Sequence, residues 1–309
     1  MLGFQVRLRK NVWLLVAVGF LPISAFCASP VAPIVVSITP LQWLVEAIAP
    51  KGAHVQTIMP AGKSPHDYLL LPSDLALIKN SALLVWVGPA METWLVQRAT
   101  SLSPDRQLAL LPASADKQHN AETSTIRQVL TDDPHIWLDP LRLAEVAVPL
   151  AARLTQLYPK DKALIAQRLA DYQRTMAALS ASLMEGFAPV AKRSFVVYHD
   201  GYAPLVRRYG LNQRMAVWRH EAIANGVRER EALIKLLRSG EVTCLFYEPE
   251  YGASAVNGWL GKAADNVSIV ELDPLGQDVP PGPNDYLRFM RALSEKMVAC
   301  LQGKKVGGN

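Results

Sequence analysis

Three histidines and one aspartate stand where apolar runs of this chain end, and their side chains are donors that a transition metal binds. His66 lies in a turn after the β-rich run HVQTIMPAG, and His135 follows a proline in TDDPHIWLDP. His199 comes directly after the run SFVVY, and Asp273 ends the apolar run VSIVELD. Three imidazoles and one carboxylate can form a tetrahedral zinc shell, and imidazole nitrogen suits zinc better than manganese or calcium. These residue types predict a zinc site.

The spacing of the four residues matches no local metal motif, because 69, 64 and 74 residues separate them in turn. Their shared placement at strand or loop ends is the stronger signal, since open α/β sheets bind ligands at the carboxyl ends of their strands. A further aspartate stands within two residues of each histidine: Asp67, Asp133 and Asp200. Metal-bound imidazoles usually donate their other N–H to such an acceptor.

The elements that must position these side chains form an alternating pattern. Short β-rich runs alternate with helical patterns from Pro33 to about residue 100, and the alternation restarts at residue 194. It predicts parallel sheets with covering helices. Helical periodicity fills residues 140–187, and Pro159 breaks it into two pieces. The second piece would span about 43 Å as a helix, which is long enough to join two lobes. The predicted fold is therefore α/β, with two parallel-sheet lobes. If both sheets turn their carboxyl edges inward, the four metal-binding candidates can meet in the cleft between the lobes.

The first 28 residues have the pattern of a cleaved secretory signal. Three basic residues precede the apolar run VWLLVAVGFLPISAF, which is shorter than the roughly 20 residues of a membrane-spanning helix. We expect cleavage after Cys27 or Ala28 and a soluble mature chain. Lipid attachment at Cys27 is less favoured, because lipid-modified cysteines usually follow a small residue, whereas Phe26 precedes Cys27. Three of the five excess positive charges leave with the leader, and no nucleic-acid partner is expected.

Cleavage leaves two cysteines, Cys244 and Cys300. An even pair in an oxidising compartment most often forms a disulfide. Closing this loop would stabilise the fold by roughly 4 kcal/mol in the chain-entropy model.

Several segments resemble the zinc-binding members of the periplasmic metal-binding proteins of ABC importers. The similar segments are SPHDYLLLPSDLALIKNSALLVWVGPAMETWL, HIWLDP, YHDGYAPLVRRYGL, CLFYEPEY and LDPLG, in the same order over nearly the whole mature chain. The resemblance implies lobes over 29–158 and 188–309, a rigid linker helix over 159–187, and one metal ion between the lobes. It also implies that His66, His135, His199 and Asp273 bind the metal and that Cys244 pairs with Cys300.

Two features depart from the family pattern. Many zinc-binding members carry a long loop rich in histidine and acid, but residues 112–133 hold only His119, so accessory metal capture there is not expected. Some members have a glutamate before the first histidine as an extra ligand. Pro65 occupies that position, which puts more weight on Asp273.

The resulting hypothesis is a monomeric periplasmic protein that captures Zn²⁺ and delivers it to an ABC permease without catalysing a reaction. Manganese or iron is the alternative cargo, although family members that bind manganese tend to carry an acid at the position of His199. A metal-dependent adhesin could share the fold. A zinc hydrolase is less favoured, because the chain has no H-E-x-x-H or G-x-S-x-G motif. Glu248 and Glu250 could be cleft carboxylates or turn residues, and His220 is expected at the surface.

Overall fold

A computed structural model describes Gly3 and residues 32–111, 133–220, 223–224, 227–282 and 284–304 of the 309-residue chain. The predicted leader, apart from Gly3, and the loop that holds His119 lie outside the described residues. Every helix and strand given below belongs to the unit Val31–Asn309.

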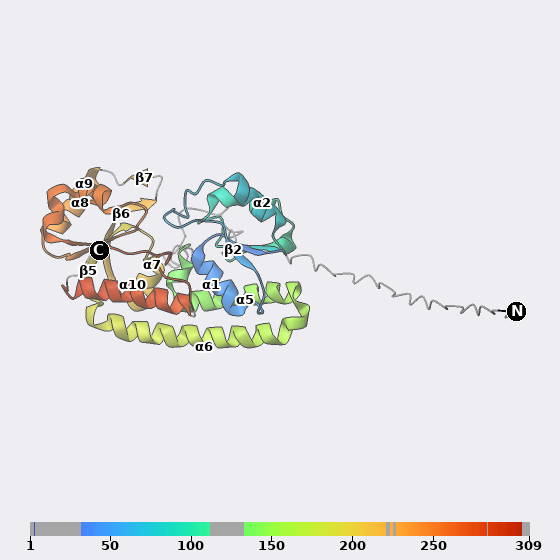
Figure 1. Cartoon of the computed structure of the whole chain (residues 1–309). Coiled ribbons are helices and arrows are strands. Elements are labelled where there is room, and N and C mark those ends of the chain that lie inside the picture. Colours follow the sequence, from blue (N-terminus) through green and yellow to red (C-terminus); the bar gives the residue numbers. More distant parts are fainter. Residues whose placement is uncertain are drawn as a thin grey trace, which may run out of the picture. The chain divides into compact units, whose positions relative to one another are not determined.

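The N-terminal lobe is built on a four-stranded parallel sheet in the order β2-β1-β3-β4 (Figure 1). Its strands are β1 (Ile34–Val36), β2 (Val55–Thr57), β3 (Leu83–Trp86) and β4 (Gln107–Ala109). β1 and β3 are buried throughout, as expected of central strands that helices cover. The helices are α1 (Thr39–Ile48), α2 (Pro72–Asn80) and α3 (Val96–Thr100). α1 and α2 carry a proline in their first turn, where no helical N–H is needed.

Two long helices follow, α5 (Pro140–Leu157) and α6 (Lys162–Phe187). A 3-10 turn at Pro159–Asp161 separates them, so Pro159 divides the helical stretch as predicted. The 26 residues of α6 span about 39 Å. Figure 1 shows α6 passing beneath both lobes, and α5, α1 and α10 contact it.

The C-terminal lobe holds a five-stranded sheet in the order β7-β6-β5-β8-β9. β5 (Ser194–His199), β6 (Asn212–His220), β8 (Cys244–Tyr247) and β9 (Ser268–Glu271) are parallel, whereas the two-residue edge strand β7 (Ile223–Ala224) is antiparallel. The prediction of a parallel sheet therefore holds for all of these strands except β7. The helices are α7 (Ala203–Tyr209), α8 (Val227–Arg238), α9 (Ala253–Leu260) and α10 (Asp285–Leu301). Further 3-10 turns lie at Thr93–Leu95, Pro104–Arg106, Ile136–Leu138, Ala188–Val190 and Gly261–Asn266.

The larger of two hydrophobic clusters among the described residues runs through both lobes, and the smaller one lies within the C-terminal lobe. The larger cluster includes Ile34 of β1, Phe187 of α6, Phe195 of β5 and Phe289 of α10, all at most 2% exposed. Moving the lobes apart would expose apolar surface at a cost of about 25 cal/mol per Å². The continuous core therefore favours a fixed arrangement of the lobes.

The predicted disulfide is formed between Cys244, at the start of β8, and Cys300, near the end of α10. Both residues are buried, and their Cα atoms lie 6.1 Å apart. The bridge attaches the last helix to β8, an interior strand of the C-terminal sheet.

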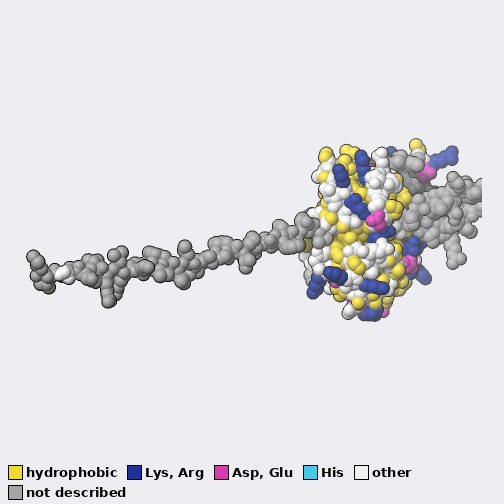
Figure 2. Space-filling view, turned by 90° about the vertical axis from the view of Figure 1, so that its right-hand side faces the viewer, with side chains coloured by type: hydrophobic (Ala, Val, Ile, Leu, Met, Phe, Trp, Pro, Cys, Tyr) yellow, Lys and Arg dark blue, Asp and Glu magenta, His cyan; other side chains and the backbone are white. Residues whose placement is uncertain are grey.

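The surface mixes charged and apolar side chains. On the face drawn in Figure 2, Lys and Arg side chains stand apart from one another among apolar and uncharged ones, and acidic side chains lie near some of them. This face therefore carries no block of positive charge. Among the described residues, no helix is both long enough and apolar enough to cross a bilayer.

Candidate metal centre

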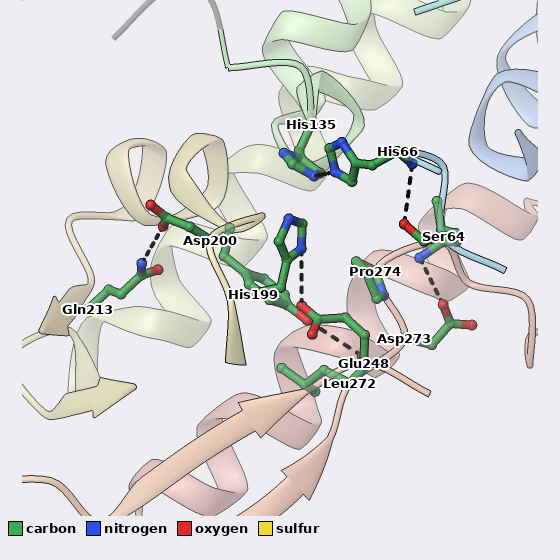
Figure 3. Close-up of polar contacts among 12 residues, drawn as sticks. Ser64, His66, His135, His199, Asp200, Gln213, Glu248, Leu272, Asp273 and Pro274 are labelled. Atoms are coloured by element: carbon green, nitrogen blue, oxygen red, sulfur yellow. Dashed lines mark hydrogen bonds and ion pairs between the residues drawn. The ribbon is translucent and has the colours of Figure 1, made fainter. Parts of the chain in front are cut away.

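Three imidazole rings meet where the carboxyl ends of the two sheets face each other. The ring centroids of His66, His135 and His199 are 5.1 to 5.2 Å apart in each pair. One ring nitrogen from each can be chosen so that all three lie within 4.8 Å of one another. Figure 3 shows the rings turned toward a common point. The structure thus brings together the three histidines that the sequence singled out.

His66 lies in the loop between β2 and α2, and contacts within the N-terminal lobe hold that loop. The indole Nε1 of Trp94 donates to the carbonyl oxygen of Pro65 at 2.8 Å, and the backbone N–H of His66 donates to Ser64 Oγ at 3.2 Å. The peptide group between Pro65 and His66 is therefore anchored through both its carbonyl oxygen and its N–H.

His135 precedes the 3-10 turn that leads into α5, and Asp133 fixes its ring. Asp133 Oδ1 accepts from the backbone N–H of His135 and lies 2.9 Å from its Nδ1. Burial alone would raise the pKa of Asp133, but the hydrogen bonds and charge of His135 outweigh it, so the pKa is lowered. This contact directs His135 Nε2 toward the centre, where it lies 3.1 Å from His66 Nε2.

His199 is the last residue of β5, and a buried glutamate stands behind it. Glu248 follows the parallel neighbour β8 directly, is fully buried, and places Oε1 3.7 Å from His199 Nδ1. In Figure 3 the other ring nitrogen of His199 points to the remaining two histidines. Burial, followed by the charges of Glu248 and Glu250, raises the pKa of Tyr202 well above its usual value. The side chain of Glu248 therefore faces the cleft, while its backbone carbonyl accepts from the N–H of Tyr251 in the turn around Pro249, so both roles left open by the sequence apply.

Asp273 lies two residues beyond β9, at the same edge, but its carboxylate is directed into its own turn. Oδ1 accepts from the N–H of Leu275 at 2.8 Å, and Oδ2 accepts from the N–H groups of Gln277 and Asp278. Figure 3 shows it apart from the three rings, and it is not among the groups that approach one another within 4.8 Å. Burial raises the pKa of Asp273. Its assignment as a ligand stays a prediction.

The turn that holds Asp273 is tied to the N-terminal lobe at two points. Trp137 Nε1 donates to the carbonyl oxygen of Pro274 at 2.6 Å, and the N–H of Gly62 donates to Gln277 Oε1 at 2.6 Å. Trp137 is fully buried. Moving the Asp273 carboxylate to the histidines would disturb this turn.

The remaining candidates lie elsewhere. Asp200 Oδ1 accepts from Gln213 Nε2 at 2.8 Å, and the side chain of Asp67 is exposed. His54 is exposed and outside the histidine group. His119 and the side chain of His220 lie outside the described residues.

The geometry suits one tetrahedral zinc ion. Two nitrogens bound to zinc at 2.0 to 2.1 Å lie about 3.3 Å apart at the tetrahedral angle, close to the 3.1 Å between His66 and His135. A Cβ at Gly201 would lie 2.9 Å from His199 Nδ1 and 3.1 Å from His135 Nε2. Glycine at this position therefore leaves the two imidazoles uncrowded.

The comparison with known proteins agrees with this donor set. Residues 34–300 match the family model described as "Zinc-uptake complex component A periplasmic", or ZnuA. The chain belongs to this family. It is 28% identical over 321 residues to a high-affinity zinc uptake system protein ZnuA of Yersinia pestis, covering 96% of this chain and 100% of that protein. The predicted resemblance to a zinc-binding solute-binding family is confirmed.

Solved structures share the fold of this ZnuA family member. A crystal structure of ZnuA aligns with a TM-score of 0.70 at 23% identity, over 87% of this chain and 99% of that chain. The laminin-binding protein of Streptococcus agalactiae, called a bifunctional protein with adhesin and metal transporting activity, aligns with a TM-score of 0.70 at 22% identity and the same coverage. These similarities confirm two α/β lobes joined by a long helix.

Proposed function

We propose that the chain is a periplasmic protein that captures one Zn²⁺ ion between its lobes and delivers it to an ABC permease without catalysing a reaction. The meeting of three imidazole nitrogens, one from each histidine, carries this proposal. Asp133 and Glu248 stand behind two of the rings and would orient them toward the ion. The name of the Yersinia relative, a zinc uptake protein, supports the direction of transport.

Zinc is favoured over manganese because the group that the structure assembles consists of three nitrogen donors. Imidazole suits zinc, whereas manganese prefers carboxylate and water oxygen, and zinc also stands above manganese in the general order of affinities. Manganese or iron remains the alternative cargo. It would need more oxygen donors than the described group provides.

The organisation of the mature chain forms part of the proposal. We infer a cleaved leader over residues 1–28, lobes over 29–158 and 188–309, and a linker over 159–187. The core that crosses both lobes supports a linker that resists wide opening. Local movement of the loops that carry His199 or Asp273 would then release the ion to the permease, with the protein acting as a monomer.

Titration of the mature chain with Zn²⁺ and Mn²⁺ against a chromophoric chelator tests the function. We expect one high-affinity Zn²⁺ per chain and binding of Mn²⁺ at least about 100-fold weaker. His199→Ala should lower zinc affinity by about 100-fold or more, since loss of a ligand exceeds the 10- to 100-fold typical of supporting residues. His54→Ala is the matched control, because His54 is exposed and outside the group. Tight manganese binding without zinc binding would overturn the assignment.

A further inference from the structure

A cavity of about 740 Å³ lies beside the metal centre, between the loop that carries His66 and the sheet of the C-terminal lobe. Its size falls within the roughly 300 to 1,000 Å³ of small-molecule sites. Ser64 and Asp67, on either side of His66, line one wall. Tyr198 and Trp218 contribute to the opposite wall, and the lining is more apolar than polar. A single metal ion would fill only a small part of this volume.

The aromatic wall borders the imidazole of His199. His199 and Trp218 are paired residues of β5 and β6, and Trp218 packs against the apolar cluster that includes Tyr198, the residue before His199. The ring of Tyr251 lies 6.5 Å from that of His199 and 4.8 Å from that of Tyr198. A molecule that fills the cavity would therefore lie next to a ligand of the ion.

The polar groups of the cavity point to the chemistry of its occupant. Trp218 Nε1 is buried and has no acceptor among the described residues, although buried indole N–H groups usually have one. The ammonium group of Lys63 adds one positive charge to the lining, the carboxylates of Asp67 and Glu250 add two negative charges, and Leu69 and Leu71 contribute exposed apolar side chains. These features suit an organic molecule with an apolar body and a hydrogen-bond acceptor, and the mixed charges of the lining do not require that its body be charged.

The donor set leaves a coordination position on the ion for an oxygen atom of such a molecule. The described group supplies three nitrogens, and the backbone of its own turn binds the Asp273 carboxylate. Zinc held by three protein ligands takes a further ligand from outside the protein. A water molecule could be this further ligand, but a water ligand does not require an apolar cavity beside the ion. A chelator that enters with the ion would supply the fourth ligand of the zinc and fill the cavity beside it.

We infer that the protein takes up zinc as a complex with a small organic chelator. An anionic oxygen of the chelator completes the zinc shell, and its apolar body lies against Trp218 and Tyr251. This inference rests on the proposed function, because it requires zinc on the three histidines. Competition titration with Zn²⁺ alone tests that function separately.

The test compares two probes that differ only in their apolar body. Benzohydroxamate and acetohydroxamate bind zinc through the same pair of oxygens, releasing the hydroxamate proton to the buffer. Calorimetric titration of the zinc-loaded mature chain should show benzohydroxamate binding about tenfold or more tightly than acetohydroxamate. Neither probe should bind comparably to the zinc-free chain.

Trp218→Ala should remove most of the preference for benzohydroxamate and change the affinity for Zn²⁺ itself by less than about threefold. Trp218→Phe keeps a ring and removes only the N–H, so it provides a second variant if the first is unstable. Trp259→Ala, in α9 and outside the cavity lining, is the matched control. Equal binding of the two probes to the zinc-loaded wild type, or an unchanged preference in Trp218→Ala, would overturn the inference. Failure to bind Zn²⁺ alone would instead refute the proposed function.

Discussion

The Nε2 atoms of His66 and His135 lie 3.1 Å apart, although 69 residues separate the two histidines in the chain. Both belong to the N-terminal lobe, where Ser64 and Asp133 hold their backbones. His199 comes from the other lobe. An ion bound to all three would therefore bridge the lobes at a site that the folded protein already forms.

Glu248 should matter for zinc although it lies behind a ligand. Its Oε1 is 3.7 Å from His199 Nδ1, and a carboxylate in this place orients the ring and makes its other nitrogen a better donor. Glu248→Gln keeps the shape and removes the charge, so we expect zinc affinity to fall about 10- to 100-fold in a competition titration. Glu241→Gln is the control, because that exposed carboxylate pairs only with Arg214 among the described residues. An unchanged affinity in Glu248→Gln would refute this role.

Asp273→Asn tests the fourth predicted ligand. If the carboxylate keeps its bonds to the N–H groups of Leu275 and Asp278, zinc affinity should change by less than about threefold and the free energy of unfolding should fall by about 1 kcal/mol. The contacts in the structure favour this result. A loss of zinc affinity above about tenfold would instead establish Asp273 as a ligand.

Much of this site could be predicted from the sequence because each histidine follows a recognisable local pattern. His199 ends a β-branched run, and His135 precedes a helix start marked by Asp139 and Pro140. Parallel strands place their carboxyl ends at one edge, so these side chains can meet if both sheets turn that edge toward the cleft, and the family resemblance implied that they do. The disulfide could be predicted from the number of cysteines and their compartment.

Other features depend on tertiary contacts that the sequence does not display. The environment of Glu248 exists only once β8 lies beside β5. The backbone bonds of Asp273 depend on the shape of its turn. β6 was missed because it begins with Asn212, Gln213 and Arg214, which do not resemble a buried strand, although its pairing with β5 holds it in the sheet.

Glu92 should make stability depend on pH. It is fully buried and accepts from Ser37 Oγ at 2.6 Å and from the N–H groups of Val87 and Gly88. Burial raises its pKa to about 7 despite these hydrogen bonds. Because this folded pKa exceeds the unfolded value, the folded state binds the proton more tightly, and stability falls as pH rises from about 4.5 to about 7.

Glu92→Gln removes this titration. The free energy of unfolding of the variant relative to wild type should rise by about 2 kcal/mol between pH 5 and pH 8. Urea unfolding of both proteins across this range measures the difference, and other titrating groups cancel in the comparison. A constant difference would show that Glu92 keeps one protonation state throughout.

Removing the disulfide should destabilise the chain. The bridge closes a loop with a sequence separation of 56 residues, which corresponds to about 4 kcal/mol in the chain-entropy model. The difference in free energy of unfolding is measured by urea unfolding of two proteins, the oxidised wild type and the double variant Cys244→Ala, Cys300→Ala. A difference below about 1 kcal/mol would mean that the packing of α10 alone holds the last helix in place.

X-ray absorption at the zinc edge of the zinc-loaded mature chain tests the central claim most directly, because it reports the ligands of the bound ion. The three-histidine site predicts one zinc per chain with three imidazole nitrogens at about 2.0 to 2.1 Å. A chain that retains no zinc, or a spectrum without imidazole scattering, would contradict it.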